Sequence, residues 1–286
     1  MYQAGLVLEG GGMKGVYTAG VLDLFLDKEI EFSSVYGVSA GAVNMCSYLS
    51  KQRGRSRDVT LDYLDIKRYC SWESLITTGD LFNVQMCYHL IPEYLNPYDY
   101  ETFDRYRGRA FSVATDIVTG KPEYFRIRDM KKDIDKLRAS ASLPLVSRNV
   151  KIGGRLYLDG GISDSIPLLR SVVDGNRKNV VVLTKERGFV RKPSSQSLLL
   201  GLRYLRYPKV AELMSWRHVH YAAQTAYVER MRKSGQVFVI RPKKDIGVGR
   251  VEKNLEKLME LYRQGYEDAK GCYGEMMQFL GDVPDQ

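Results

Sequence analysis

The pentapeptide G-V-S-A-G at residues 37–41 is the sequence feature that most constrains how this chain folds. It follows a short β-prone run at residues 33–36 and precedes a helix-prone run at residues 42–45. A serine hydroxyl is a poor nucleophile unless the backbone exposes it and a base accepts its proton. A sharp strand-to-helix turn exposes such a serine, and flanking glycines let the two elements approach closely. The pattern therefore predicts Ser39 on a nucleophile elbow, but many chains match it by chance and it needs support from other segments.

A glycine-rich segment near the N-terminus supplies part of that support. Residues 5–9 (GLVLE) indicate a buried strand, residues 10–15 (GGGMKG) a loop, and residues 16–22 the start of a helix. Consecutive glycines leave backbone N–H groups uncovered, and the helix that follows adds the positive end of its dipole. The loop is therefore suited to hold an anion, either a phosphate or the oxyanion that forms when a serine attacks a carbonyl.

The phosphate interpretation has support of its own. The G-x-G-x-x-G pattern of residues 10–15 matches the dinucleotide fingerprint, and Glu29 and Glu31 lie near the position of a ribose-binding acid. An ATP-binding P-loop fits less well, because glycine and not serine or threonine follows Lys14. The next strand and turn deliver Ser39, for which a dinucleotide-binding fold has no use. We favour an oxyanion hole and keep a nucleotide-binding module as the alternative.

A third segment supplies an acid. Residues 155–158 form a short, largely apolar run that ends in Asp159, and Gly160 and Gly161 follow directly. The two glycines allow a sharp turn, so we expect Asp159 at a strand end with its carboxylate aimed into a site. An ordinary turn aspartate is the alternative, because Asp-Gly is common in turns.

Together these segments resemble the patatin-like phospholipase family, most of all its small bacterial members. Residues 10–15, 37–41 and 159–161 match the family's three motifs and fall in its order. Residues 139–145 (ASASLPL) look like the small-residue stretch that the family carries shortly before the aspartate. The resemblance covers about residues 5 to 185. The combination of three motifs is far more specific than any one of them.

The resemblance implies a catalytic dyad, with Ser39 as nucleophile and Asp159 as general base. It also assigns further site residues: an oxyanion hole in the loop Gly10, Gly11, Gly12, Met13, Lys14 and Gly15, elbow glycines Gly37 and Gly41, and the motif glycines Gly160 and Gly161. Lys14 stands where the family usually has arginine or lysine, and we expect it to steady the loop or the developing charge.

The implied function is that of a serine lipid acyl hydrolase of the phospholipase A or esterase type, acting on a lipid or acyl-ester substrate. Neither a metal nor an organic cofactor is expected, because the oxyanion hole replaces a Lewis acid. Headgroup, acyl-chain preference and oligomeric state are not indicated by the sequence.

A conventional Ser-His-Asp α/β-hydrolase esterase is the rival enzyme class. Its chain order of serine, acid and histidine is met by Ser39, Asp159 and then His218 or His220. Both histidines lie in a helix-like run, whereas the catalytic histidine of that fold normally lies on a loop. We therefore expect ester hydrolysis to survive replacement of both histidines.

Composition limits the partners and the location. The formal net charge of +9 draws the chain to anionic surfaces, and peripheral contact with an anionic membrane is a hypothesis. No nucleic-acid-binding motif is present. No apolar run approaches a membrane span, and no secretory signal is evident, so we expect a cytoplasmic protein. Four cysteines without C-x-x-C spacing indicate reduced thiols and no zinc site.

The pattern of elements predicts a three-layer α/β/α fold with a central, mainly parallel sheet. Further strands are expected at residues 179–184 and 236–241, and a hairpin from residues 111–116 and 123–127. Residues 58–106 are aromatic-rich and read as irregular; we expect them to pack, although they could wall an acyl pocket. We predict one domain over residues 1–286, with core motifs in residues 5–185 and a mostly helical part, residues 186–286, packed on that core. Helical spacing is found near residues 198–205, 209–233 and 251–280.

Overall fold

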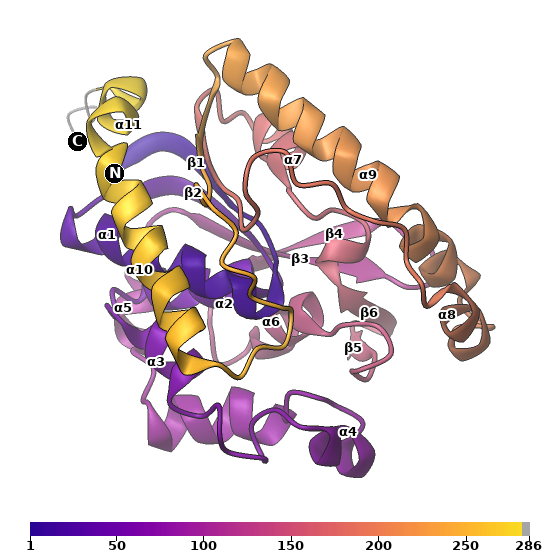
Figure 1. Cartoon of the computed structure of the whole chain (residues 1–286). Helices are drawn as coiled ribbons and strands as arrows, with labels where there is room; N and C mark the ends of the chain where they lie inside the picture. The colour runs from indigo at the N-terminus through magenta and orange to yellow at the C-terminus, as the bar shows by residue number, and fades with distance from the viewer. Residues whose placement is uncertain (282–286) are drawn as a thin grey trace.

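A central eight-stranded sheet organises the computed structural model, which describes residues 1–281 (Figure 1). The predicted domain runs to residue 286, so residues 282–286 lie outside the described part. The strand order is β5-β6-β3-β2-β1-β7-β8, and β4 pairs with β3. The strands are β1 (Tyr2–Leu8), β2 (Phe32–Val38), β3 (Arg109–Asp116), β4 (Pro122–Ile127), β5 (Val150–Ile152), β6 (Arg155–Asp159), β7 (Asn179–Val182) and β8 (Val237–Ile240).

The sheet is mixed. Strands β3, β2, β1, β7 and β8 run parallel, whereas β4, β6 and β5 join by antiparallel pairing. The hairpin expected on either side of residues 119–121 is confirmed as β3 and β4, and the strands expected near residues 179–184 and 236–241 are confirmed as β7 and β8. Parallel strands need long crossovers, usually helical, which here carry the glycine loop and the serine turn.

Both faces of the parallel part are buried, because successive side chains of a strand point to opposite faces. Leu6 and Leu8 belong to one apolar cluster, and Val7 between them belongs to another. The same alternation places Val35 in the first cluster and Tyr36 in the second. The sheet is therefore the middle of three layers, which agrees with the predicted α/β/α architecture.

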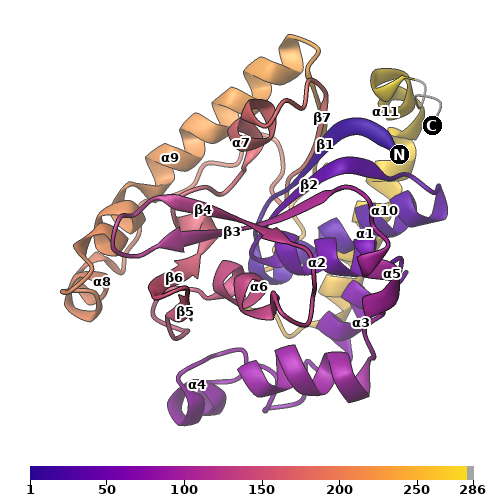
Figure 2. The ribbon, with the colours of Figure 1, turned by 180° about the vertical axis from the view of Figure 1, so that it is seen from behind.

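Helices cover the two faces (Figures 1 and 2). On one side lie α1, α2 and α10, and on the other lie α7 and α9. The helices are α1 (Val16–Asp27), α2 (Ala40–Leu49), α3 (Arg55–Leu61), α4 (Trp72–Thr78), α5 (Tyr100–Asp104), α6 (Ile134–Ala141), α7 (Leu168–Val173), α8 (Ser197–Arg203), α9 (Pro208–Lys233), α10 (Leu255–Gly271) and α11 (Tyr273–Leu280). Three short helices of other types are η1 (Gly12–Gly15), η2 (Met86–Leu95) and η3 (Gly160–Ile162).

The C-terminal part of the chain packs on the core. Helix α10 lies along α1, where the Tyr262 hydroxyl donates to Asp23 at 2.6 Å and the Tyr17 hydroxyl donates to Asp268 at 3.2 Å. Strand β8 adds to the edge of the sheet beside β7. Within the described residues, no helix is both long and apolar enough to span a bilayer.

Residues 58–106 are less irregular than expected. They contain α4, α5 and η2 and the end of α3, and most of their tyrosines and phenylalanines pack into or against the main apolar cluster; Tyr94 is exposed. Tyr69, Tyr98 and Phe103 are buried there. None of these aromatic side chains lines the cavity described next. This segment therefore serves packing and is not a wall of that cavity.

Candidate active site

Ser39 occupies a sharp turn between β2, which ends at Val38, and α2, which begins at Ala40. Its backbone has φ +54° and ψ −122°, a conformation that a residue with a Cβ adopts only under strain. A Cβ on Gly41 would lie 2.5 Å from the carbonyl oxygen of Leu8, so only glycine fits there. The turn has the backbone geometry expected of a nucleophile elbow.

Asp159 ends β6 and is 1 % exposed. The N–H of Gly161 donates to its Oδ1 at 2.7 Å, whereas its buried Oδ2 has no hydrogen-bond partner. Burial raises the pKa of Asp159, and the charge of Arg217 and the Ser39 hydroxyl oppose that rise. The Ser39 hydroxyl is close enough to lower the pKa of Asp159, but it does not form a hydrogen bond with Oδ2. One carboxylate oxygen is therefore held in place and the other remains available.

The small-residue stretch at residues 139–145 ties these two positions together. The Ser39 N–H donates to the Ser140 hydroxyl at 2.9 Å, and the Asp159 N–H donates to the Ser142 carbonyl at 2.7 Å. Both serines are buried. Because the two bonds come from residues two apart at the end of α6, this stretch fixes the spacing between the elbow and the aspartate.

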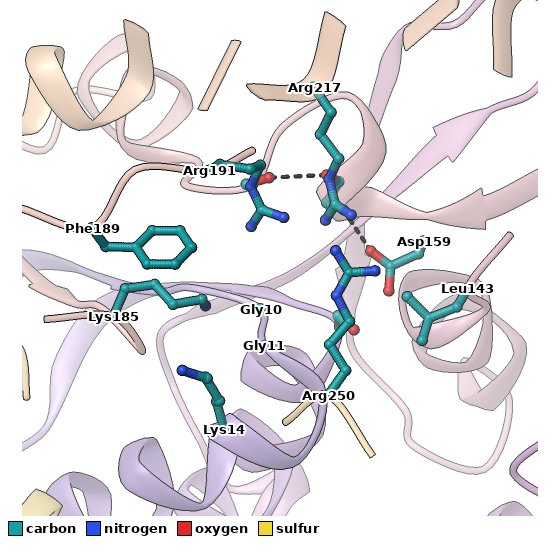
Figure 3. Close-up of a pocket in the computed structure, with 14 residues that line it drawn as sticks. Gly10, Gly11, Lys14, Leu143, Asp159, Lys185, Phe189, Arg191, Arg217 and Arg250 are labelled. Carbon is teal, nitrogen blue, oxygen red and sulfur yellow. Dashed lines mark hydrogen bonds between the residues drawn. The ribbon is translucent and has the colours of Figure 1, made fainter. Parts of the chain in front are cut away.

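Ser39, Asp159 and the glycine loop line one cavity of about 180 Å³. Gly10, Gly11 and Gly12 are also in its wall, as is Lys14 (Figure 3). The remaining predicted site residues lie beside the cavity without lining it: Met13, Gly15, Gly37, Gly41 and Gly160. The structure therefore brings together three motifs that lie at residues 10–15, 37–41 and 159–161 of the sequence.

The glycine loop differs from expectation at Met13. Its N–H donates to the carbonyl oxygen of Arg250 at 3.0 Å, so in this conformation it does not point a free donor at the cavity. Within residues 1–281, the N–H groups of Gly11 and Gly12 donate to no acceptor. Lys14 forms a salt bridge with Asp245, at 3.3 Å. Only the first part of the loop thus offers unpaired donors.

The histidines do not join this arrangement. His218 and His220 lie on α9, and neither lines the cavity that holds Ser39 and Asp159. The neighbouring Arg217 does line it. On a helix, successive residues point about 100° apart, so one position in a run can face a site while its neighbours do not. The geometry gives no support to the rival triad.

Three arginines in the cavity wall were not predicted from the sequence. Arg191, Arg217 and Arg250 come from the loop after β7, from α9 and from the loop before α10. Figure 3 shows the Arg217 and Arg250 side chains beside the Asp159 carboxylate, and Arg191 between Arg217 and Phe189. They belong to no motif and are separated by long stretches of chain, so no local signal marks them. The cavity wall also includes Lys185.

The chain is similar in sequence to known proteins. A family model described as patatin-like phospholipase matches residues 6–170. The uncharacterized protein YjjU of Escherichia coli K12 is 28 % identical over 268 residues, which cover 91 % of this chain and 74 % of YjjU. The probable lipid hydrolase 463L of Invertebrate iridescent virus 6 is 25 % identical over 204 residues, covering 62 % of this chain and 66 % of that protein.

The fold has a solved counterpart. The crystal structure of VipD from Legionella pneumophila superposes with a TM-score of 0.51 at 13 % identity, covering 98 % of this chain and 67 % of VipD. A second family model, for a domain of unknown function, matches residues 207–281. That segment contributes β8 to the common sheet and carries Arg217 and Arg250. A single unit over residues 1–286 remains our proposal.

Proposed function

Because the chain belongs to the patatin-like phospholipase family, we propose that it is a carboxylic ester hydrolase of lipid acyl esters, with Ser39 as nucleophile and Asp159 as general base. The family supports lipid hydrolase activity, and the name of the viral relative is consistent with it. The observation that carries the proposal is the unpartnered Oδ2 of Asp159, in the cavity that also holds Ser39 on its strained turn.

The proposed first step is acyl transfer. Ser39 Oγ attacks the ester carbonyl carbon while Oδ2 of Asp159 accepts the hydroxyl proton. An aspartate with an ordinary pKa, about 3.9, is a weak base toward serine. Burial raises the pKa of Asp159 and so improves it as a base, while the fixed Oδ1–Gly161 bond keeps the carboxylate oriented. The alcohol then leaves with the proton from Asp159.

The negative charge on the carbonyl oxygen needs donors. Within the described residues, the N–H groups of Gly10, Gly11 and Gly12 donate to no acceptor, and we assign the oxyanion hole to those of Gly11 and Gly12. Removing one preorganised N–H donor of this kind lowers the rate by about 10²–10³-fold. Water then attacks the acyl-enzyme, Asp159 accepts its proton, and the carboxylic acid is released as Ser39 regains its hydrogen.

We also propose that the protein contacts lipid at its periphery through α8. Leu198 is 81 % exposed, Leu202 is 61 % exposed and Leu205, just beyond the helix, is 75 % exposed. Arg203 lies between Leu202 and Leu205, and Arg206 follows Leu205 directly. Exposed apolar side chains beside basic ones suit the surface of an anionic bilayer, where each cation adds about 1 kcal/mol.

The test of the catalytic assignment is labelling with a fluorophosphonate probe together with hydrolysis of p-nitrophenyl esters. Wild type is compared with S39A, D159N and an H218Q/H220Q double variant. Labelling that is lost in S39A, with turnover abolished in S39A and D159N and retained in the double variant, supports the proposal. A folded wild type that neither labels nor hydrolyses an ester of any chain length contradicts it, and thermal stabilisation by nucleotides would then test the alternative use of the loop.

A further inference from the structure

The cavity around Ser39 is strongly cationic. Its wall carries one carboxylate, Asp159, and five cationic side chains. Two of the cations have acidic partners of their own: Lys14 pairs with Asp245 at 3.3 Å, and Lys185 pairs with buried Glu9 at 3.3 Å. The remaining three are Arg191, Arg217 and Arg250. Within the described residues, every arginine salt bridge involves other arginines, so these three guanidinium groups have no ion-pair partner.

Different contacts position the three arginines. Arg217 Nε donates to the carbonyl of Gly161 at 2.6 Å. The Arg191 guanidinium lies over the ring of Tyr221, 4.5 Å from its centroid, and its buried Nε has no hydrogen-bond partner. The Arg250 backbone is anchored by the Met13 N–H. All three line the cavity that the glycine loop also lines (Figure 3).

Gathering these groups is unfavourable without an anion. Desolvation and, after it, the charge of Arg191 lower the pKa of Arg217 to about 10. A single carboxylate cannot neutralise three guanidinium groups, and Asp159 already accepts a bond from Gly161. An arginine guanidinium donates two parallel hydrogen bonds to a pair of phosphate oxygens. A phosphate group has enough oxygens to accept from three arginines at once, whereas a carboxylate has only two oxygens.

We propose that Arg191, Arg217 and Arg250 bind a phosphate group of the substrate, so that the preferred substrate is an acyl ester with a phosphate close to the scissile carbonyl. This inference rests on the proposed function. The cavity of about 180 Å³ has room for the ester and the phosphate, whereas pockets that enclose a whole ligand measure roughly 300–1,000 Å³. The acyl chain of such a substrate extends out of the cavity.

The matched substrates are a monoacylglycerol and the same monoacylglycerol carrying a phosphate on its free primary hydroxyl. We expect wild type to hydrolyse the phosphorylated ester with the higher kcat/KM. In R250Q and in R191Q the ratio of the two kcat/KM values falls by about 10- to 100-fold, the effect of losing a hydrogen bond to a charged group. In R230Q, which removes one positive charge elsewhere on α9, the ratio stays at the wild-type value.

Two results overturn the inference: a wild type without preference for the phosphorylated ester, and an equal fall of the ratio in R230Q. If the preference is absent but inorganic phosphate inhibits competitively, the site binds free phosphate only. If folded wild type hydrolyses neither ester, the proposed function fails separately. Calorimetric titration with inorganic phosphate then decides the anion site: binding lost in R250Q supports phosphate recognition, and no binding to wild type refutes it.

Discussion

Arg217 Nε donates a 2.6 Å hydrogen bond to the carbonyl oxygen of Gly161, whose own N–H donates to Asp159 at 2.7 Å. A Cβ on Gly161 would lie 2.8 Å from Arg217 Nη2 and 2.9 Å from Asp159 Oδ1, so glycine is needed for this close approach. A helix of the C-terminal segment is thereby connected to the Asp-Gly-Gly motif, and it brings a positive charge next to the aspartate.

That relationship predicts a change in pH dependence. Burial raises the pKa of Asp159 above its usual value and the Arg217 charge opposes the rise, so R217Q raises this pKa further. Because the base must be deprotonated, we expect the acidic limb of kcat/KM for a neutral ester to move to higher pH in R217Q. R217K keeps the charge and moves the limb less. A pH profile of R217Q with the wild-type limb would show that Asp159 is not the titrating base.

The strain at Ser39 predicts a difference between two inactive variants. Alanine at this position keeps the φ of +54° with a Cβ, whereas glycine removes the steric conflict. We expect S39G to be about 1 kcal/mol more stable than S39A in urea unfolding. Relief of backbone strain stabilises the glycine variant, and the greater entropy of its unfolded state offsets part of that gain. Equal midpoints would mean that the elbow is not strained. Both variants should lack turnover.

The hydroxyl of Ser140 predicts a positioning role. In S140A the buried Ser39 N–H loses its acceptor, which costs about 1–3 kcal/mol of stability and shifts the elbow. S142A is the control, because Ser142 binds the Asp159 N–H through its backbone carbonyl, which the substitution keeps. We expect the kcat of S140A to be well below that of S142A. The measurement is ester hydrolysis by the two folded variants. Similar activity in the two variants would argue against this role.

We expect ester hydrolysis not to depend on the two histidines of α9. His218 and His220 do not line the cavity, so the H218Q/H220Q variant should keep ester hydrolysis within a few-fold of wild type. The measurement is p-nitrophenyl ester turnover, with circular dichroism to verify folding. A loss greater than about 10³-fold in the folded variant, the scale of a missing triad member, would replace the dyad by a triad.

We expect the activity on lipid vesicles to depend on the exposed leucines of α8. In L198S/L202S, we expect the ratio of activity on anionic vesicles to activity on a soluble ester to fall about tenfold, because two exposed leucines no longer enter the interface. V173S removes an equally exposed apolar side chain from α7 and is the control. An unchanged ratio in the double variant would place lipid contact elsewhere on the protein.

The sequence by itself determined the parts of this protein whose chemistry depends on local backbone geometry. The strand-to-helix turn at Ser39, the uncovered N–H groups of residues 10–12 and the strand end at Asp159 each need glycine within a few positions, and that need is visible in the chain. Alternation of side chains likewise indicated the buried sheet. Helices hidden in residues 58–106 were not indicated, because their aromatic residues follow the packing of the core and no short period.

Tertiary structure alone decided the charge of the cavity. Arg191, Arg217 and Arg250 lie in three separate elements, and each looks like an ordinary basic residue in its own neighbourhood. The Arg250 carbonyl also accepts the Met13 N–H, so that within the described part of the loop the N–H groups without an acceptor are those of Gly10, Gly11 and Gly12. Such contacts join segments far apart in the chain, and their formation depends on how α9 and the loop before α10 pack against the sheet, which no local pattern encodes.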